Sequence, residues 1–526
     1  MKSLNESIKR EMRNPTKTGL IITSLLIIFL SAVFSVIYYS FNLNQDPDPD
    51  TYIMQYIENP EAENVMIDHL IENPLDLEMI NTLIYFRLIG EKSRVTSENY
   101  SQDPFLNRVK EITGINDSYI RTRIMSDTEG LENTVNELLK NPEDAYSNFL
   151  IGTLLREEQK DLEALTFFRK AETLGLESKH NKLSILNILL TLKWTNDLNE
   201  ILTKEDYRSL CDNSCMLNYM ILTRNYTGVI PHTILSEIEN YQALIVIVSL
   251  LVGLGWYITL LHLGRGSEWK KSYLILSMGA VILGMISAHI TVIAVVIEEQ
   301  ILGFDGYNYD LAGEVIYSIL GIGLREELIK LICFLPIIPF IIKKSEKRFI
   351  LTFASLVGLG FAIEENIGYY AAGGEAVTAR FLTANFFHIT LTGYCGYYLV
   401  EAFRKGGEHI GIFFTEFAKM TVLHGLYDFF LISSHITELS FLSMTIFIWL
   451  SGEYLGILTF QRYTVIPRVS LQFLFTAVLS LTVGAGFFLA VSMFGPGEAV
   501  FAILTGVLGN IIIAVMFFRY FHAGGN

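Results

Sequence analysis

Four apolar stretches of this chain carry acidic, basic or imidazole side chains near their centres. These residues are Glu326, Glu327 and Lys330 in the first stretch, Glu365 and Asn366 in the second, His388 in the third, and His424 and Asp428 in the fourth. A charged side chain at the centre of a bilayer costs about 2.5 kcal/mol or more, so such groups face a protein interior or water. Four consecutive helices with such groups at similar depth predict one buried polar centre.

These residue types are suited to hydrolysis. A carboxylate can take a proton from water, and an imidazole can stabilise an oxyanion or protonate a leaving amine. Glu326 and Lys330 are four positions apart, on one face of a helix, so the lysine would keep a carboxylate ionised. His424 and Asp428 have the same spacing, which resembles an imidazole oriented by a carboxylate. Glu and His also ligate zinc, but the zinc motif HExxH does not occur in the sequence.

Each of these residues taken alone has a structural alternative, because a buried polar group often only forms a hydrogen bond with a neighbouring helix. The coincidence of all four groups favours chemistry. Other charged residues lie nearer the ends of their apolar stretches, and we expect no chemistry from them. They are Glu416 and Lys419, which are predicted to form an ion pair, Glu453, and Arg380.

The whole chain has the composition of a polytopic, all-α membrane protein. It has 526 residues, 51% of them hydrophobic, and a mean hydropathy of +0.38. About 20 apolar residues cross a bilayer as a helix, and we expect about ten such helices. The predicted spans are Gly19–Phe41, Ala243–Leu263, Tyr273–Ile297, Ala312–Ile341, Phe349–Tyr370, Val377–Val400, Gly411–Leu431, Leu439–Phe460, Val469–Phe494 and Ala499–Phe518.

Basic residues in the loops predict the orientation of the chain. The basic N-terminus favours a retained anchor with a cytoplasmic start over a cleaved signal peptide. After the anchor and the segment that follows it, loops with Lys and Arg alternate with loops that have neither. We therefore expect an integral protein of a bacterial plasma membrane, with both termini in the cytoplasm and residues 42–241 outside it.

The segment 42–241 is predicted to be a separate acidic, helical domain, because it accounts for essentially all of the net charge of −16. Nothing in it is basic enough to hold nucleic acid. The stretch FLIGTLLREEQKDLEALTFFRKAETL has small residues at the spacing of a tetratricopeptide (TPR) repeat, although a generic helical bundle is the alternative. A TPR-like domain would bind a protein partner. Cys211 and Cys215 form either a local disulfide or two free thiols.

The four polar stretches together resemble the PrsW family of intramembrane proteases, which is related to the CAAX-processing and bacteriocin-processing membrane proteases. The resemblance rests on four ordered motifs within about residues 312–431. These are EExxK at Glu326, Glu327 and Lys330, FxxxEN at Phe361, Glu365 and Asn366, the single His388, and HxxYD at His424, Tyr427 and Asp428. The domains would then be a cytoplasmic start and anchor (1–41), the acidic domain (42–241), and the protease bundle (242–526).

The resemblance implies cleavage of membrane-anchored protein substrates in the lipid bilayer, such as anti-sigma factors, by a glutamate-activated water. It makes Glu326 the base and Glu327 and Glu365 supporting carboxylates, with His388 and His424 stabilising the oxyanion or positioning the water. Lys330, Asn366 and Asp428 would support them. We expect no cofactor, with zinc on Glu326, Glu365, His388 and His424 as the alternative. The large domain before the bundle departs from the short family pattern and puts the substrate in doubt.

Two other functions are compatible with the sequence. A proton- or cation-coupled transporter also uses buried Glu, His and Asp side chains, but transporters usually have paired halves, and no second copy of the polar groups is found here. In the other alternative, a receptor or scaffold, the acidic domain carries the function and the polar centre is vestigial.

Overall fold

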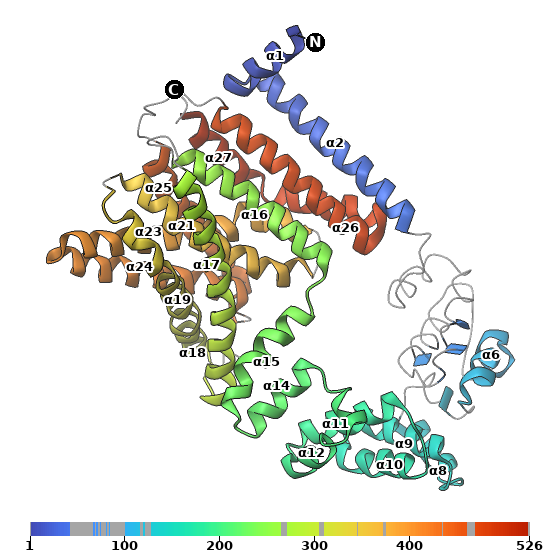
Figure 1. Ribbon diagram of the computed structural model, residues 1–526. Helices are drawn as coiled ribbons and strands as arrows, with labels where there is room; N and C mark the ends of the chain where they lie inside the picture. Colours follow the sequence, from blue (N-terminus) through green and yellow to red (C-terminus); the bar gives the residue numbers. More distant parts are fainter. Residues whose placement is uncertain are drawn as a thin grey trace. The chain divides into compact units, whose positions relative to one another are not determined.

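Helices form all the regular structure in the part of the chain that the structure, a computed structural model, describes (Figure 1). That part comprises residues 2–42, 67–68, 70–71, 74, 80–81, 84, 100–115, 119–120, 128–264, 271–304, 310–344, 346–371, 375–433, 435–459 and 469–523. The predicted all-α class is confirmed for these residues. The chain divides into a membrane unit, Met1–Phe41 with Glu237–Asn526, and an acidic unit, Asn42–Ser236.

The membrane unit is a bundle of helices with a continuous apolar core. Its α-helices are α1 (Lys2–Arg13), α2 (Lys17–Asn42), α16 (Ala243–Leu263), α17 (Lys271–Val296), α18 (Leu311–Ile316), α19 (Arg325–Phe334), α20 (Ile338–Ile341), α21 (Lys347–Tyr370), α22 (Glu375–Leu382), α23 (Ala384–Lys405), α24 (Glu408–Ile432), α25 (Phe441–Thr459), α26 (Leu471–Gly509) and α27 (Ile511–Ala523). Short segments join some of them: the π-helices η3 (Ile297–Ile301) and η4 (Tyr317–Leu324) and the 3₁₀ helices η5 (Leu335–Ile337) and η6 (Thr437–Leu439).

Six described helical segments are long and apolar enough to cross a membrane. They are Lys17–Phe41, Ala243–Leu263, Lys271–Ile301, Lys347–Tyr370, Thr437–Thr459 and Leu471–Gly509. The expected count of ten is therefore not confirmed. Two other expected spans, Ala312–Ile341 and Gly411–Leu431, are helical but carry several charged residues each.

Two predicted spans have different boundaries in the structure. Val377–Val400 is broken at Thr383, whose φ of −110° and ψ of −86° are not helical and whose hydroxyl donates to the carbonyl of Ala379. Near the C-terminus, the range Leu471–Gly509 of α26 comprises two helices that meet at a kink at Gly495, the first residue of the predicted loop, which has φ of 81° and ψ of 168° and precedes Pro496. Glycine tolerates this φ and proline lacks an N–H, so the first helix ends at Gly495 and the second begins after it.

Glycines let the helices with polar residues approach closely. A Cβ at Gly425 in α24 would lie 2.4 Å from the Cα of Ile319 in η4, and one at Gly323 would lie 2.4 Å from a backbone oxygen of α24. On α21, a Cβ at Gly358 would lie 2.3 Å from the backbone oxygen of His388. Small residues at helix crossings allow such backbone contact inside membranes. These contacts place η4, which leads into α19, against α24 and place α21 against α23.

Both ends of the chain lie at one end of the membrane unit. The N–H of Ser470, just before α26, donates to the carbonyl of Met12 in α1 at 2.8 Å. The side chains of Gln472, in the first turn of α26, and His522, in the last turn of α27, are 3.0 Å apart. The end of α1, the start of α26 and the end of α27 therefore lie close together at one end of the bundle.

The acidic unit consists of short helices around its own apolar core. They are η2 (Tyr100–Gln102), α6 (Pro104–Thr113), α8 (Thr128–Leu138), α9 (Ala145–Glu157), α10 (Asp161–Thr173), α11 (Lys179–Thr191), α12 (Thr195–Ile201), α13 (Glu205–Arg208), α14 (Asn213–Leu222) and α15 (Tyr226–Glu239), whose last three residues belong to the membrane unit. In the predicted repeat, Gly152 of α9 packs on Phe168 of α10, where a Cβ would lie 2.8 Å from the ring.

The N-caps of α9, α11 and α14 recur at a constant interval. Asp144, Ser178 and Asp212 each accept a hydrogen bond from the backbone N–H three residues later, and each follows the previous one by 34 positions (144, 178, 212). A period of 34 residues is that of tetratricopeptide repeats. The TPR-like assignment itself stays a prediction.

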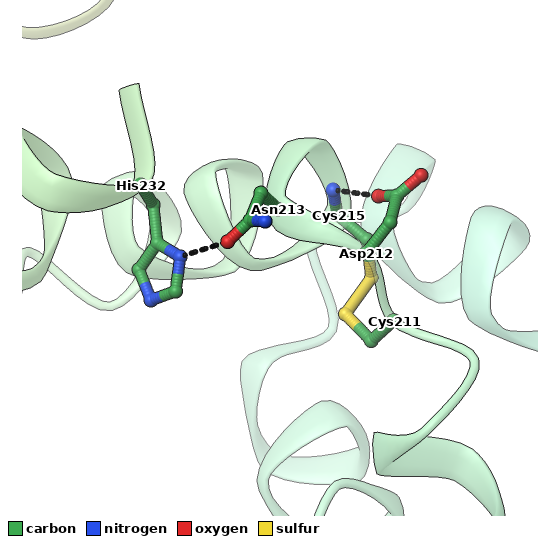
Figure 2. The surroundings of a disulfide bond; sticks show 5 residues. All are labelled: Cys211, Asp212, Asn213, Cys215 and His232. Atoms are coloured by element: carbon green, nitrogen blue, oxygen red, sulfur yellow. Dashed lines mark hydrogen bonds between the residues drawn. A yellow bond between two sulfur atoms is a disulfide. The ribbon is translucent and has the colours of Figure 1, made fainter. Parts of the chain in front are cut away.

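Cys211 and Cys215 form a disulfide in the structure, which decides between the two alternatives left open by the sequence (Figure 2). Their Cα atoms are 5.2 Å apart, within the usual range for a disulfide. Asp212 caps α14 beside the bridge, and the side chains of Asn213 and His232 lie 3.0 Å apart (Figure 2).

Replacing Gly425 by alanine should weaken the contact between α24 and η4, because the new methyl group has no space. We expect the free energy of unfolding in detergent to fall by about 1–3 kcal/mol, the range of overpacked cores. Gly411→Ala on the same helix is the matched control, since a Cβ there meets nothing within 4 Å. Equal unfolding temperatures for the two variants would contradict the close crossing.

The disulfide predicts how Cys211 and Cys215 react with a maleimide-polyethylene glycol reagent. In denatured full-length protein lacking the other thiols (Cys333→Ser, Cys395→Ser), we expect no mass shift before reduction and two additions after it. The shift is measured by gel electrophoresis. Labelling without a reductant would show that the two thiols are free.

Candidate active site

The polar residues predicted from the four stretches meet in the membrane unit. Helix α19 supplies Glu326, Glu327 and Lys330, α21 supplies Glu365 and Asn366, α23 supplies His388, and α24 supplies His424 and Asp428. All are buried except Glu365 and Asp428, which are partly exposed. The wide turns of η4 directly precede α19, and π-helical turns are frequent at functional sites.

Lys330 lies at the centre of this cluster and is 0% exposed. Its Nζ is 3.1 Å from Oε2 of Glu326, 3.0 Å from Oε1 of Glu327 and 3.0 Å from Nδ1 of His388. An ammonium group has three N–H donors, and these three acceptors can use all of them. The charge also lies 3.8 Å from the centre of the Phe361 ring, a favourable cation–π distance. The lysine thus joins α19 to α23 and packs on α21.

His424 is surrounded by carboxylates. Its Nδ1 lies 3.1 Å from Oε1 of Glu327, and its Nε2 lies 3.4 Å from Oδ2 of Asp428 and 3.7 Å from Oε2 of Glu326. The spacing of His424 and Asp428 therefore produces the contact expected from it. The ring centre of His388 is 5.3 Å away, so two imidazoles flank the Glu326 carboxylate.

Arg380, from which the sequence predicts no chemistry, contacts this cluster, and the expectation itself stays a prediction. Its guanidinium donates to Oε2 of Glu365 at 2.6 Å and to the side-chain oxygen of Asn366 at 2.5 Å. Glu365 Oε2 is also 3.0 Å from Nε2 of His388. The break at Thr383 sets α22 apart from α23 and allows this approach. The only signal in the sequence was a lone arginine in an apolar stretch. The ion pair predicted for Glu416 and Lys419 is present at 3.6 Å and lies outside this cluster.

A second network lies next to the first and was not predicted. Both ring nitrogens of His289 in α17 face carboxylates: Nδ1 is 2.9 Å from Glu237, and Nε2 is 3.3 Å from Glu364. Tyr241 donates to the same Glu364 oxygen at 2.6 Å. Glu364 directly precedes Glu365, so this network fixes the end of α21 beside the site.

Arg325, for which the sequence predicts no role, pairs with Glu298 in η3. Its Nη1 donates to a Glu298 carboxylate oxygen at 2.5 Å. The neighbouring Glu299 accepts a hydrogen bond from Tyr317 in η4 at 2.7 Å. Two contacts thus tie the end of α17 to the segment that leads into α19.

A cavity of about 420 Å³ reaches this cluster from one end of the bundle. Its charged lining residues are Glu237, Arg325, Glu326, Glu364 and Glu365. Apolar side chains such as Ile245, Val292 and Phe361 line the rest of it. An apolar cavity with a few convergent polar groups is the usual form of a substrate site.

Three of the clustered residues fit a metal ion. One donor atom each from Glu326, His388 and His424 lies within 4.8 Å of the others, and all three residues are buried. A carboxylate with two imidazoles is a ligand set of catalytic zinc sites, which keep a further position open. The three residues fit zinc in the type and number of their donor atoms. In this structure, Lys330 contacts two of them, Glu326 and His388. Glu365, which the zinc alternative includes, is not part of this group and pairs with Arg380.

Comparison with known proteins gives one match. Residues 273–451 match the family model described as PrsW family intramembrane metalloprotease. The matched segment contains all four motifs, and the resemblance based on them is confirmed. No similar curated protein and no similar solved structure was found. The match to a protease family does not favour the transporter alternative.

Lys330→Met should destabilise the membrane unit strongly, because Glu326 and Glu327 would then be buried without their cation. Removing one partner of a buried ion pair costs about 3–5 kcal/mol. Lys419→Met is the matched control, since that side chain is 39% exposed and its pair should be worth about 0–1 kcal/mol. The free energy of unfolding in detergent is the measurement, and the double variant Lys330→Met, Glu327→Gln should recover part of the loss. Similar losses for the two lysine variants would contradict the central role of Lys330.

Proposed function

We propose that this chain, a peptidase whose residues 273–451 belong to the PrsW family of intramembrane proteases, cleaves membrane-anchored proteins by carboxylate-activated attack of water. One observation carries the proposal: the buried Glu326 lines the cavity and is held between a lysine and two histidines. A segment of substrate in this cavity would be next to a base and to groups that bear or donate protons. Anti-sigma-factor-like proteins are one class of such substrates.

The side chains support an order of events. Glu326 takes a proton from water as the water oxygen attacks the scissile carbonyl carbon. The imidazole of His424, whose Nε2 is 3.7 Å from the Glu326 carboxylate, would stabilise the negative charge that develops on the carbonyl oxygen. His388, whose ring nitrogens contact Lys330 and Glu365, would help to position the water. The carbon–nitrogen bond then breaks as the leaving nitrogen receives the proton held by Glu326. Lys330 offsets the negative charge of the Glu326 side chain, and Asp428 orients His424.

A metal is compatible with the same residues. Glu326, His388 and His424 would hold zinc, which would act as a Lewis acid on the scissile carbonyl. Glu327 contacts His424, and Glu365 contacts His388, so these two carboxylates orient the imidazoles. Arg380 in turn holds Glu365 in place.

We place the cavity near the extracytoplasmic face. Helix α21 runs from a basic end, Lys347, to Tyr370, whose neighbour Ala371 lines the cavity. At the basic end, Arg404 donates to the carbonyl of Lys344 at 2.9 Å, so two basic loops lie together. Basic loops stay in the cytoplasm, which leaves the cavity at the other side. Both termini are then cytoplasmic, and the disulfide-containing acidic unit lies in the compartment where disulfides persist.

For the acidic unit we propose three TPR-like repeats that begin near residues 145, 179 and 213 and bind a protein partner. The 34-residue interval of the N-caps supports this assignment. Stacked helix pairs of this kind form extended binding surfaces, which suits the recruitment of a substrate or a regulator.

Glu326→Gln and His424→Gln should abolish cleavage, because each removes a group that touches the reacting atoms. We expect a loss of at least about 100-fold, the usual contribution of a general base. The measurement is mass spectrometry of protein N-termini in membranes of cells that express each variant. Glu416→Gln, a partly exposed glutamate on α24, is the matched control and should keep the wild-type pattern.

If cells that express wild type, cells that express Glu326→Gln and cells with an empty vector have identical sets of protein N-termini, the chain cleaves no protein and the proposal is wrong. A second experiment distinguishes the metal-free mechanism from the zinc-dependent one. A chelator is added to the purified protein together with a reporter that the protein cleaves. Loss of cleavage that added zinc restores assigns a metal to the site, and unchanged cleavage assigns the water activation to Glu326 alone.

A further inference from the structure

We propose that Glu237 is a specificity-determining residue that binds a lysine or arginine side chain of the substrate. This inference rests on the proposed function and names the class of substrate: membrane-anchored proteins with a basic residue on the extracytoplasmic side of the cleavage site. The side chain of Glu237 is 26% exposed and lines the same cavity as Glu326. A polypeptide in the cavity can therefore reach both carboxylates.

Two carboxylates of the cavity share one imidazole. His289 lies between Glu237 and Glu364, with its Nδ1 2.9 Å from the first and its Nε2 3.3 Å from the second. Tyr241 also donates to Glu364, but its hydroxyl brings no positive charge. An imidazole carries at most one positive charge, so two ionised carboxylates leave at least one negative charge over. The side chain of Glu364 is only 4% exposed, so salt and water screen this charge little.

The other charged residues of the cavity lining are each paired with an oppositely charged side chain. The pairs are Glu326 with Lys330, Glu365 with Arg380, and Arg325 with Glu298. Among the described residues, Glu237 and Glu364 are the lining carboxylates that no lysine or arginine contacts. The excess negative charge of the cavity therefore lies at these two. Because charges interact strongly in a partly buried site, this wall favours a cation and disfavours an anion.

The uncharged walls of the cavity suit the stem of a basic side chain. Val292 and Val295 of α17 and Ile367 of α21 line the cavity. Lysine and arginine bury their methylene stems along apolar surfaces and place only the charged end at a polar group. A small inorganic cation would gain nothing from these walls. A basic side chain therefore fits the cavity better than a free ion does.

The position of Glu237 makes this preference selective. Glu237 precedes α16, which begins at Ala243, so the orientation proposed above places it on the extracytoplasmic side. Membrane proteins carry most of their lysines and arginines in cytoplasmic loops. A basic residue next to the span on the other side would mark a minority of membrane-anchored proteins, and the charge of Glu237 would distinguish these from the rest.

The test measures cleavage of three single-span reporter proteins by the purified full-length protein. The reporters are identical except for lysine, glutamine or glutamate at one position within a helical turn of the cleavage site, on its extracytoplasmic side. Each reporter is combined with wild type, Glu237→Gln, Glu237→Lys and Glu239→Gln. The last variant is the matched control, since Glu239 is an exposed glutamate of α15 outside the cavity lining.

We expect wild type and Glu239→Gln to cleave the lysine reporter with a kcat/KM about 10- to 100-fold above that for the glutamine reporter, the size of one hydrogen bond between charged groups. Glu237→Gln should cleave these two reporters equally, because its side chain is neutral. Glu237→Lys should prefer the glutamate reporter, since the charges are then exchanged.

Equal cleavage of the three reporters by wild type, or an unchanged lysine preference in Glu237→Gln, would overturn the inference. A uniform loss with all three reporters in Glu237→Gln would assign this residue a structural role and overturn it as well. Failure of the wild type to cleave any reporter would instead overturn the proposed function, and this specificity with it.

Discussion

The site depends on one buried positive charge. The Lys330 ammonium contacts two carboxylates, an imidazole and an aromatic ring, and none of it is exposed. Without it, Glu326 and Glu327 would be neighbouring anions in an apolar bundle, a state that costs far more than an exposed pair. With it, the two carboxylates and His388 are held at fixed distances on two helices. The geometry of the candidate site therefore depends on Lys330.

The sequence predicts the cluster well because membranes make charged residues informative. The helical period shows that Glu326 and Lys330 share a face, and the cost of burial indicates that His388 and Asp428 must have partners. The same reasoning fails for Arg380. Its contact with the site depends on a backbone break at Thr383 that no local pattern indicates.

Contacts between distant segments were also out of reach. Tyr241 and Glu364 are 123 positions apart, and no pattern in either segment points to the other. The direction of Arg325 depends on η4, because a π-helical turn rotates every later side chain relative to an α-helix. In the acidic unit, by contrast, the sequence does contain the 34-residue interval, but the residues that carry it are helix N-caps and not core residues. Core residues predict one repeat, whereas Asp144, Ser178 and Asp212 reveal the interval.

The charges on α19 have a consequence for how the protein enters the membrane. An isolated helix is released into lipid according to its apolarity, and each central charge adds about 2.5–3.5 kcal/mol against release. Arg325, Glu326, Glu327 and Lys330 lie within two turns, so this segment is a poor independent insertion unit. We therefore expect this segment to enter the bilayer together with α21 and α23, which carry the ring of Phe361 and the imidazole of His388 that contact Lys330.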